Sequence, residues 1–197
     1  IVIFRPKGMN NAYYAQFGWV PSGNFAVPNE DTIWHSSANV ISPNKPVTLS
    51  WSNGDGLTFK RTYTIDENYM FTITQKVINT SKKPIKLNAY GLVSRRGTPE
   101  TTGFYILHEG LLGVFDDTLT EIDYEDIQET GQAKQTSKGG WIGITDKYWL
   151  AALIPDQKSN NNTRFLYSKQ NNVDTYQIDY VSPLLSVAAG RSAKTIN

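Results

Sequence analysis

The chain has 197 residues, of which 39% are hydrophobic and 19% charged, a balance typical of a folded globular protein and unlike that of a disordered one. Its 19 Lys and Arg residues nearly cancel its 18 Asp and Glu residues, and the net charge of +1 lacks the basic excess that nucleic-acid binding requires. The absence of cysteine excludes disulfides, Cys-ligated zinc and Cys nucleophiles.

Strand-like alternation dominates the first half of the chain. Hydrophobic and polar side chains alternate over residues 57–65, and a second alternating run covers residues 69–77. The residues between them, Asp66-Glu67-Asn68, have the composition of a turn, so the two runs predict a β-hairpin. After a polar connection at residues 79–84, residues 85–93 alternate again and predict a further strand.

The second half continues in the same way. Further runs predict strands at residues 141–144, 149–154 and 176–180, and a short one between Pro183 and Gly190. Thr145-Asp146-Lys147 has the composition of a turn, and the polar stretch 158–163 (KSNNNT) predicts a solvated loop. Residues 119–129 fit neither period well, so one helical turn and an irregular loop both stay open there.

Antiparallel strands at this spacing, separated by Gly, Pro and Asn, predict an all-β sandwich in one domain over residues 1–197. The longest apolar run, residues 148–155, falls short of the roughly 20 residues that span a bilayer. The chain opens within an apolar run and stops within a β-like run, so we expect it to be trimmed at both ends from a longer membrane protein.

Two histidines, His35 and His108, are present, without the H-E-x-x-H arrangement of a zinc site. His108 and Glu109 form the one pair that suggests acid–base chemistry. On a regular strand their side chains would point to opposite faces, and a structural histidine before Gly110 is the alternative. Residues 116–126 are rich in Asp and Glu but lack the calcium-loop pattern, which favours a solvated acidic segment over a cation site. We expect neither a metal nor a cofactor.

Arg95 and Arg96 are the sharpest basic feature. Consecutive residues on a strand face opposite sides, so at most one of them points into a concave face. Their role is either an anion or partner contact, or the capping of loop carbonyls and pairing with the acidic segment. Trp141 either lines a groove or packs in the core, as do the other four tryptophans. Arg95, Arg96, His108 and Trp141 are therefore our candidate groove or partner contacts.

Four blocks of the sequence resemble one known family, in order and over nearly the whole chain. They are YAQFGWV (14–20), GLTFKRTYTIDENYMFTITQKVIN (56–79), GLVSRRGTPETTGFYILHEGLLGVFD (91–116) and GGWIGITDKYWLAALIPDQ (139–157). They resemble the large periplasmic domain of the YidC family of membrane-protein insertases in Gram-negative bacteria, and the alphaproteobacterial members most of all.

The resemblance implies a β-supersandwich of antiparallel sheets with very little helix, as in galactose mutarotase-like proteins. It also implies a location at the periplasmic face of the bacterial inner membrane, anchored by transmembrane segments outside residues 1–197. The implied function is that of an interaction or scaffold domain, without catalysis, which helps to insert and fold inner-membrane proteins with or without the Sec translocon. Implied partners are SecDF and SecYEG components, nascent membrane-protein clients and the parent chain's own transmembrane core, with no nucleic acid.

Two alternatives stay open. One is a carbohydrate-binding or aldose-epimerase-like domain on the same fold, suggested by the aromatic content and by His108-Glu109. The mutarotase catalytic His and Glu have no matching position here. The other is a free-standing structural β domain without partners.

Overall fold

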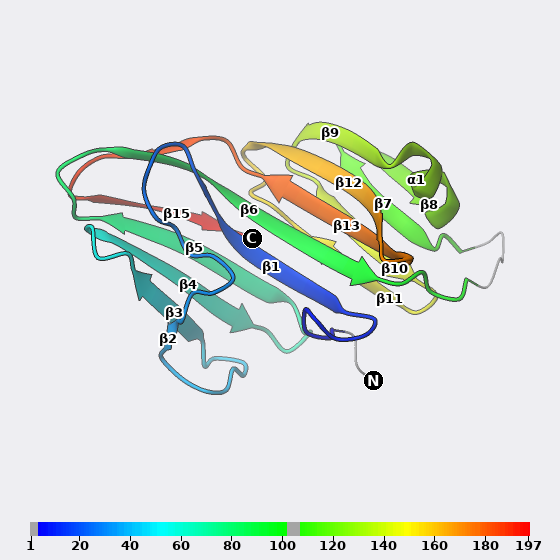
Figure 1. The fold of residues 1–197 in the computed structure, drawn as a ribbon, viewed down its shortest axis with the longest axis horizontal. Coiled ribbons are helices and arrows are strands. Elements are labelled where there is room, and N and C mark those ends of the chain that lie inside the picture. The colour runs from blue at the N-terminus through cyan, green and yellow to red at the C-terminus, as the bar shows by residue number, and fades with distance from the viewer. Residues whose placement is uncertain (1–3, 102–106) are drawn as a thin grey trace. The chain divides into compact units, whose positions relative to one another are not determined.

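The computed structural model describes residues 4–101 and 107–197, which divide into two compact units (Figure 1). Unit 1 consists of Ile1–Phe17 and Tyr90–Ser182, and unit 2 of Gly18–Ala89 and Pro183–Asn197. Residues 102–106 of the third YidC-like block lie outside the described residues. Within the described ranges, no helix is long and apolar enough to cross a membrane. That residues 1–197 form one domain stays a prediction.

Unit 2 is built on a five-stranded antiparallel sheet in the order β15-β5-β4-β3-β2. Its strands are β2 (His35–Ser36), β3 (Val47–Ser52), β4 (Leu57–Ile65), β5 (Phe71–Asn79) and β15 (Arg191–Ile196). The short strand β14 (Leu185–Val187) pairs with the first residues of β6 (Ile85–Arg96). Both β6 and β1 (Tyr13–Pro21) contribute residues to the two units.

The predicted hairpin is confirmed as β4 and β5, which pair from Leu57 and Asn79 to Ile65 and Phe71. Its turn is fixed by Asp66, whose carboxylate accepts the backbone N–H groups of Asn68 and Met70 at 2.8 and 2.9 Å. The second strand begins two residues later than predicted. Tyr69 has a φ of 62°, which is incompatible with an extended strand.

The core of unit 2 lies between this sheet and the strand pair β6 and β14. Its buried members are Trp19, Leu57, Phe59, Val77, Ile85, Leu87, Ala89 and Val187. Phe59 is fully buried, with the Trp51 ring 5.9 Å and the Trp19 ring 6.4 Å from its centroid. The alternation that predicted the strand therefore also selects the side chains that fill the core.

Asn79, at the end of β5, is a fully buried polar residue. Its Nδ2 donates to the carbonyl oxygens of Lys83 and Val187 at 2.8 and 3.0 Å. Its Oδ1 accepts the backbone N–H of Ser81 at 3.0 Å. One side chain thus holds the polar connection before β6 and the segment after β14 to the same point.

Unit 1 contains two antiparallel sheets. The first has the order β1-β6-β13-β12-β9, with β9 (Gln132–Lys138), β12 (Asn160–Gln170) and β13 (Val173–Val181). The second has the order β11-β10-β7-β8, with β7 (Gly110–Phe115), β8 (Thr118–Asp123), β10 (Trp141–Asp146) and β11 (Trp149–Leu153). The helix α1 (Tyr124–Thr130) connects β8 to β9. An edge-to-face contact at 5.9 Å between Phe115 and Phe165 joins the sheets in one core.

The register of the second sheet separates its two faces. Leu111, Ile144 and Ala151 are cross-strand neighbours and all are buried. On the opposite face Leu150 is 51% exposed and pairs with Thr145. The prediction of an all-β antiparallel fold with very little helix is confirmed.

Three local predictions need correction. Residues 158–163 are not a solvated loop, because β12 begins at Asn160 and buries Asn161 and Thr163 while pairing them with β9. The turn predicted at residues 145–147 lies one step later, since Asp146 is the last residue of β10. Residues 119–129, where one helical turn and an irregular loop stayed open, contain most of the helix α1 and most of β8, so the helical alternative holds for their second half and a strand replaces the loop in their first half.

We predict that Asn79→Ala lowers the free energy of unfolding by about 3 kcal/mol, because several buried carbonyl and N–H groups lose their partner together. Urea denaturation should show a lower midpoint at an unchanged m-value. The exposed Asn10→Ala is the matched control and should change stability by less than about 0.5 kcal/mol. A loss at Asn79 as small as that of the control would contradict the assignment.

Candidate functional site

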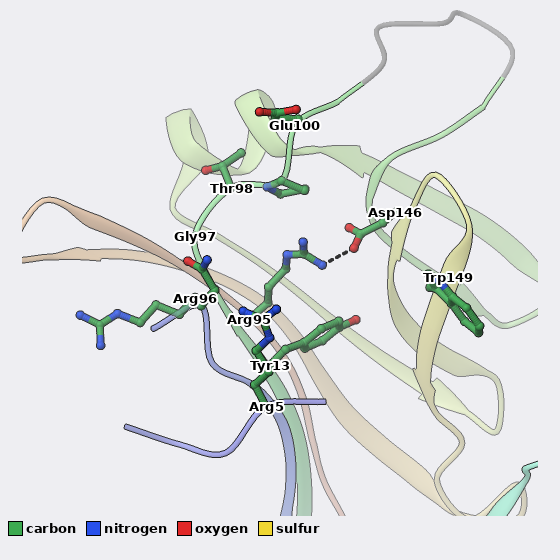
Figure 2. A pocket seen from close by; sticks show the side chains of 11 residues that line it. Arg5, Tyr13, Arg95, Arg96, Gly97, Thr98, Glu100, Asp146 and Trp149 are labelled. Atoms are coloured by element: carbon green, nitrogen blue, oxygen red, sulfur yellow. Dashed lines mark hydrogen bonds and ion pairs between the residues drawn. The ribbon is translucent and has the colours of Figure 1, made fainter. Parts of the chain in front are cut away.

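A polar pocket of about 370 Å³ lies in unit 1 (Figure 2). Its walls come from the N-terminal segment with Arg5, the end of β6 with Arg95 and Arg96, and the loop after β6. The turn between β10 and β11 completes it with Asp146 and Trp149. The pocket thus gathers side chains from three separate parts of the sequence: residues 5–13, 95–100 and 146–149.

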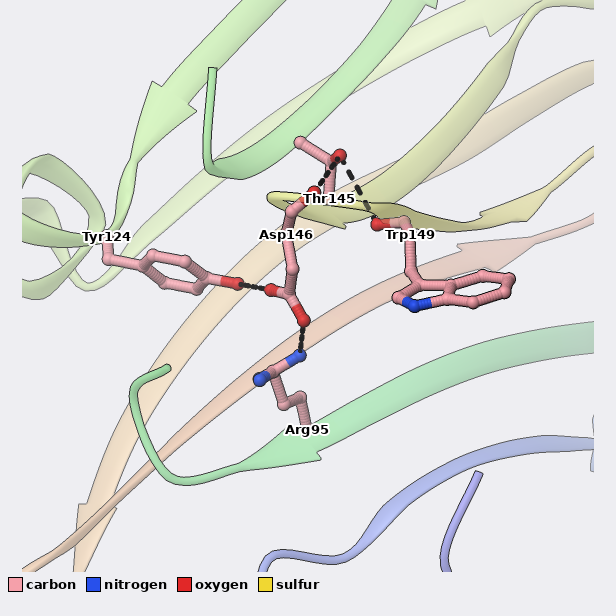
Figure 3. A network of polar contacts seen from close by, with 5 residues as sticks. All are labelled: Arg95, Tyr124, Thr145, Asp146 and Trp149. Atoms are coloured by element: carbon pink, nitrogen blue, oxygen red, sulfur yellow. Dashed lines mark hydrogen bonds and ion pairs between the residues drawn. The ribbon is translucent and has the colours of Figure 1, made fainter. Parts of the chain in front are cut away.

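An ion pair between Arg95 and Asp146 occupies the centre of the pocket wall (Figures 2 and 3). The two side chains are 16% and 22% exposed, so water screens the pair only in part. The Arg95 guanidinium also lies over the ring of Tyr13, 5.0 Å from its centroid, in a cation–π contact. The end of β6 is therefore held both to the β10–β11 turn and to β1.

Asp146 has a second partner that fixes its other oxygen. The hydroxyl of Tyr124, a residue only 3% exposed, donates to Asp146 Oδ1 at 3.0 Å (Figure 3). Burial, and next the negative charge of Asp146, raise the pKa values of both Tyr124 and Tyr13 well above their usual range. Both phenols are therefore neutral at physiological pH, and Tyr124 keeps the proton that it donates.

The loop that follows β6 is held by a second polar network. Thr98 Oγ1 lies 2.7 Å from the Tyr176 hydroxyl and donates to Asp174 Oδ2 at 3.3 Å. Tyr167 donates to the other oxygen of Asp174 at 2.7 Å, which lowers the pKa of Asp174 and raises that of Tyr167 to about 12. The turn into this loop uses Gly97 at a φ of 89°, a conformation that favours glycine.

The predicted contact residues do not share one place. Arg95 and Arg96 both line the pocket, but Arg95 points toward Asp146 while the exposed Arg96 extends away from it (Figure 2). His108 and Trp141 do not line this pocket. The strand pairing separates them, because β10 matches Thr145 with Gly110, near His108, but Trp141 with Val114.

His108 sits in a local network of its own. Its Nδ1 lies 3.1 Å from Asp123 Oδ1, and its Nε2 lies 3.1 Å from the carbonyl oxygen of Leu111. Both ring nitrogens are engaged within the protein, as in a structural histidine. Glu109, its neighbour in sequence, is only 9% exposed.

Sequence reasoning missed Arg5, Tyr124 and Asp146, and it named Trp149 only among the five tryptophans that either line a groove or pack in the core. Asp146 was assigned to a turn, and no local pattern links it to Arg95. Tyr124 lies at the start of a helix that the periodicity left open. No group of three His, Cys, Asp or Glu residues in the described part of the chain is placed to hold a metal ion. What the pocket offers is guanidinium, amide and hydroxyl donors beside one indole ring.

The sequence matches the family described as YidC periplasmic domain over residues 1–197. A protein named membrane protein insertase YidC from Rickettsia bellii is 42% identical over 194 residues, which cover 98% of this chain and 35% of that protein. A protein of the same name from Bradyrhizobium diazoefficiens is 42% identical over 196 residues, which cover 98% of this chain and 32% of that protein. The chain thus spans about a third of the length of these relatives.

Among solved structures, the fold is similar to that of a galactose mutarotase related enzyme from Lactobacillus acidophilus. The TM-score is 0.55 at 9% sequence identity, and the match covers 84% of this chain and 70% of that one. At this identity the likeness concerns the fold alone, and it confirms the predicted mutarotase-like class.

We predict that the Arg95–Asp146 pair behaves as one unit in a double-mutant cycle. Arg95→Met and Asp146→Asn should each lower the free energy of unfolding by about 2 kcal/mol, because each leaves the partner half-buried without its counter-charge. The double variant should fall short of the sum by about 1–2 kcal/mol, as measured by urea denaturation. Additive losses would show that the pair contributes nothing as a pair.

We also predict a loss of stability above pH 10 that depends on Tyr124. The folded-state pKa is raised above the unfolded value of 10.0, so the unfolded chain releases this proton first as the pH rises. The stabilisation is complete below pH 10.0 and is lost above it. Tyr124→Phe should make the decline less steep by up to about 1.4 kcal/mol per pH unit, measured by urea denaturation at several pH values. The exposed Thr118→Ala should keep the original slope, and an equal slope in Tyr124→Phe would refute the assignment.

Proposed function

The chain belongs to the YidC periplasmic domain family, and from this premise we propose that it is the periplasmic module of a membrane-protein insertase. In this role it assists the insertion and folding of inner-membrane proteins. The observation that carries the proposal is the family match over residues 1–197, supported by relatives at about 42% identity that are named membrane protein insertase YidC. Because the chain spans about a third of those relatives, the insertion activity belongs to the whole parent protein.

The proposed location is the periplasmic face of the inner membrane, with the parent chain's transmembrane segments outside residues 1–197. The proposed partners are nascent membrane proteins, the transmembrane core of the parent chain, and the SecYEG and SecDF components of the Sec translocon. The family description supports the location, and the relatives' name supports the membrane-protein clients.

We propose that the pocket acts by binding and not by catalysis. Arg95 and Asp146 neutralise each other, and the two phenols beside them keep their protons. What remains for a ligand is the Arg5 guanidinium and the Asn11 amide, beside the Glu100 carboxylate and the ring of Trp149. Donors of this kind suit the carbonyl and carboxylate oxygens of an extended polypeptide.

We predict that the pocket contacts clients or Sec components in the cell. A photo-crosslinking residue at Thr98 or Glu100 in the full-length parent protein should give adducts with a newly made membrane protein or a Sec subunit. The same probe at the exposed Lys60 of unit 2, a position outside the pocket, serves as the matched control. Adducts should be identified by mass spectrometry in cells that synthesise one defined client.

Two outcomes would contradict the proposal. An alkaline phosphatase reporter fused at Asn197 should be active, since this enzyme folds outside the cytoplasm, and an inactive fusion would refute the location. Turnover of common aldoses by the purified chain, lost in Asp146→Asn, would replace the binding role with the aldose-epimerase alternative.

A further inference from the structure

The hairpin of β10 and β11 ends in an exposed apolar tip, residues 147–150. Tyr148 is 77% exposed, Leu150 51% and Trp149 44%. Large apolar and aromatic side chains usually bury more of their surface, and three consecutive exposed ones, two of them aromatic, indicate a surface that contacts another molecule. We therefore expect the tip to contact another molecule.

The tip is held firmly by the polar network beneath it. Asp146 and Trp149 are a matched pair at the end of the hairpin, and Thr145 Oγ1 donates to the carbonyl oxygen of Trp149 at 3.4 Å (Figure 3). The Arg95 and Tyr124 contacts fix Asp146 at the base of the turn. The side chains are thus presented by a preorganised hairpin, which lowers the entropic cost of binding.

Two cationic side chains, Lys147 and Arg5, lie at or beside this tip. Lys147 lies within it, with its ammonium group 5.2 Å from the centre of the Tyr148 ring. Trp149 lines the same pocket as the cationic Arg5, whereas the guanidinium of Arg96 extends away from the pocket (Figure 2). The tip therefore combines exposed apolar side chains with the cationic groups of Lys147 and Arg5.

A second hairpin provides the contrast. The turn between β4 and β5 is also apolar and exposed, with Tyr69 82% and Met70 54% exposed. It carries Asp66 and Glu67, and residues 66–70 contain no Lys or Arg. The two tips expose their apolar side chains to a similar extent, but the charged side chains beside them have opposite signs.

We propose that the β10–β11 tip docks on an anionic lipid surface, with Tyr148, Trp149 and Leu150 entering the interface and Lys147 and Arg5 contacting headgroup phosphates. Trp and Tyr favour the membrane–water interface, and Lys can keep its ammonium group in water while its stem lies among apolar groups. Cationic side chains are attracted to an anionic bilayer, whereas Asp66 and Glu67 would be repelled from it. This proposal rests on the proposed function, which places the domain beside a membrane.

The test is binding of the purified 197-residue chain to vesicles, with phosphatidylcholine alone or with added phosphatidylglycerol. We expect binding to the anionic vesicles that Tyr148→Ser combined with Leu150→Ser weakens about tenfold or more. Lys147→Gln and Arg5→Gln should each weaken it about fivefold, as expected for one charge near an anionic surface. Brominated lipids should quench tryptophan fluorescence, and Trp149→Phe should remove that quenching.

The matched control is Tyr69→Ser combined with Met70→Ser on the acidic tip, which should leave binding unchanged. Equal binding to both kinds of vesicle, or an equal loss in the control, would overturn the proposal. Self-association in analytical ultracentrifugation that Tyr148→Ser abolishes would assign the tip to a second copy of the chain and overturn it as well.

The vesicle assay also separates this inference from the proposed function. If the purified chain does not bind vesicles but the parent protein still forms adducts with clients or Sec subunits, the lipid contact alone is refuted. If the chain binds lipid but the parent protein forms no such adducts and the alkaline phosphatase fusion is inactive, the insertase role alone is refuted.

Discussion

The half-buried ion pair of Arg95 and Asp146 is the constraint on which the functional end of unit 1 depends. The pair joins the end of β6 in one sheet to the β10–β11 hairpin in the other sheet. The hydroxyl of Tyr124, on the helix α1, donates to the same Asp146 carboxylate. Removing one partner of a partly buried ion pair lowers stability strongly, whereas the intact pair adds little net stability. The main effect of this pair is therefore to hold the β10–β11 hairpin in place.

Sequence reasoning recovered the parts of the fold in which local pattern and burial agree. The β4–β5 hairpin is one example, because alternating side chains there fill the core around Phe59. It failed for β9 and for the start of β12, whose residues are polar apart from Ala133. There the strand is formed by cross-strand pairing, with Thr163 Oγ1 donating to the Gln135 carbonyl oxygen at 3.1 Å, and no local composition encodes such a partner.

The site was predictable to a smaller extent. Two consecutive arginines drew attention to Arg95 and Arg96, and both line the pocket. The partner of Arg95 lies 51 residues away in the sequence, and only the folded sheets bring the two together. His108 and Trp141 attracted attention by their residue type alone, and strand register places them at different positions along β7 and β10. Pairing across a sheet is thus the information that one sequence lacks.

The pairing of β15 with β5 imposes an order on folding. The edge of β5 is completed only by residues Arg191–Ile196, and the hydrogen bond from Asn79 to Val187 spans 108 residues. During synthesis, and during export if the chain crosses a membrane as it is made, unit 2 therefore waits with an open strand edge until all of unit 1 has emerged. Contacts of such high sequence separation slow folding, and open edges invite mispairing. A chaperone that covers the edge of β5 until β15 has been made would benefit a protein of this topology.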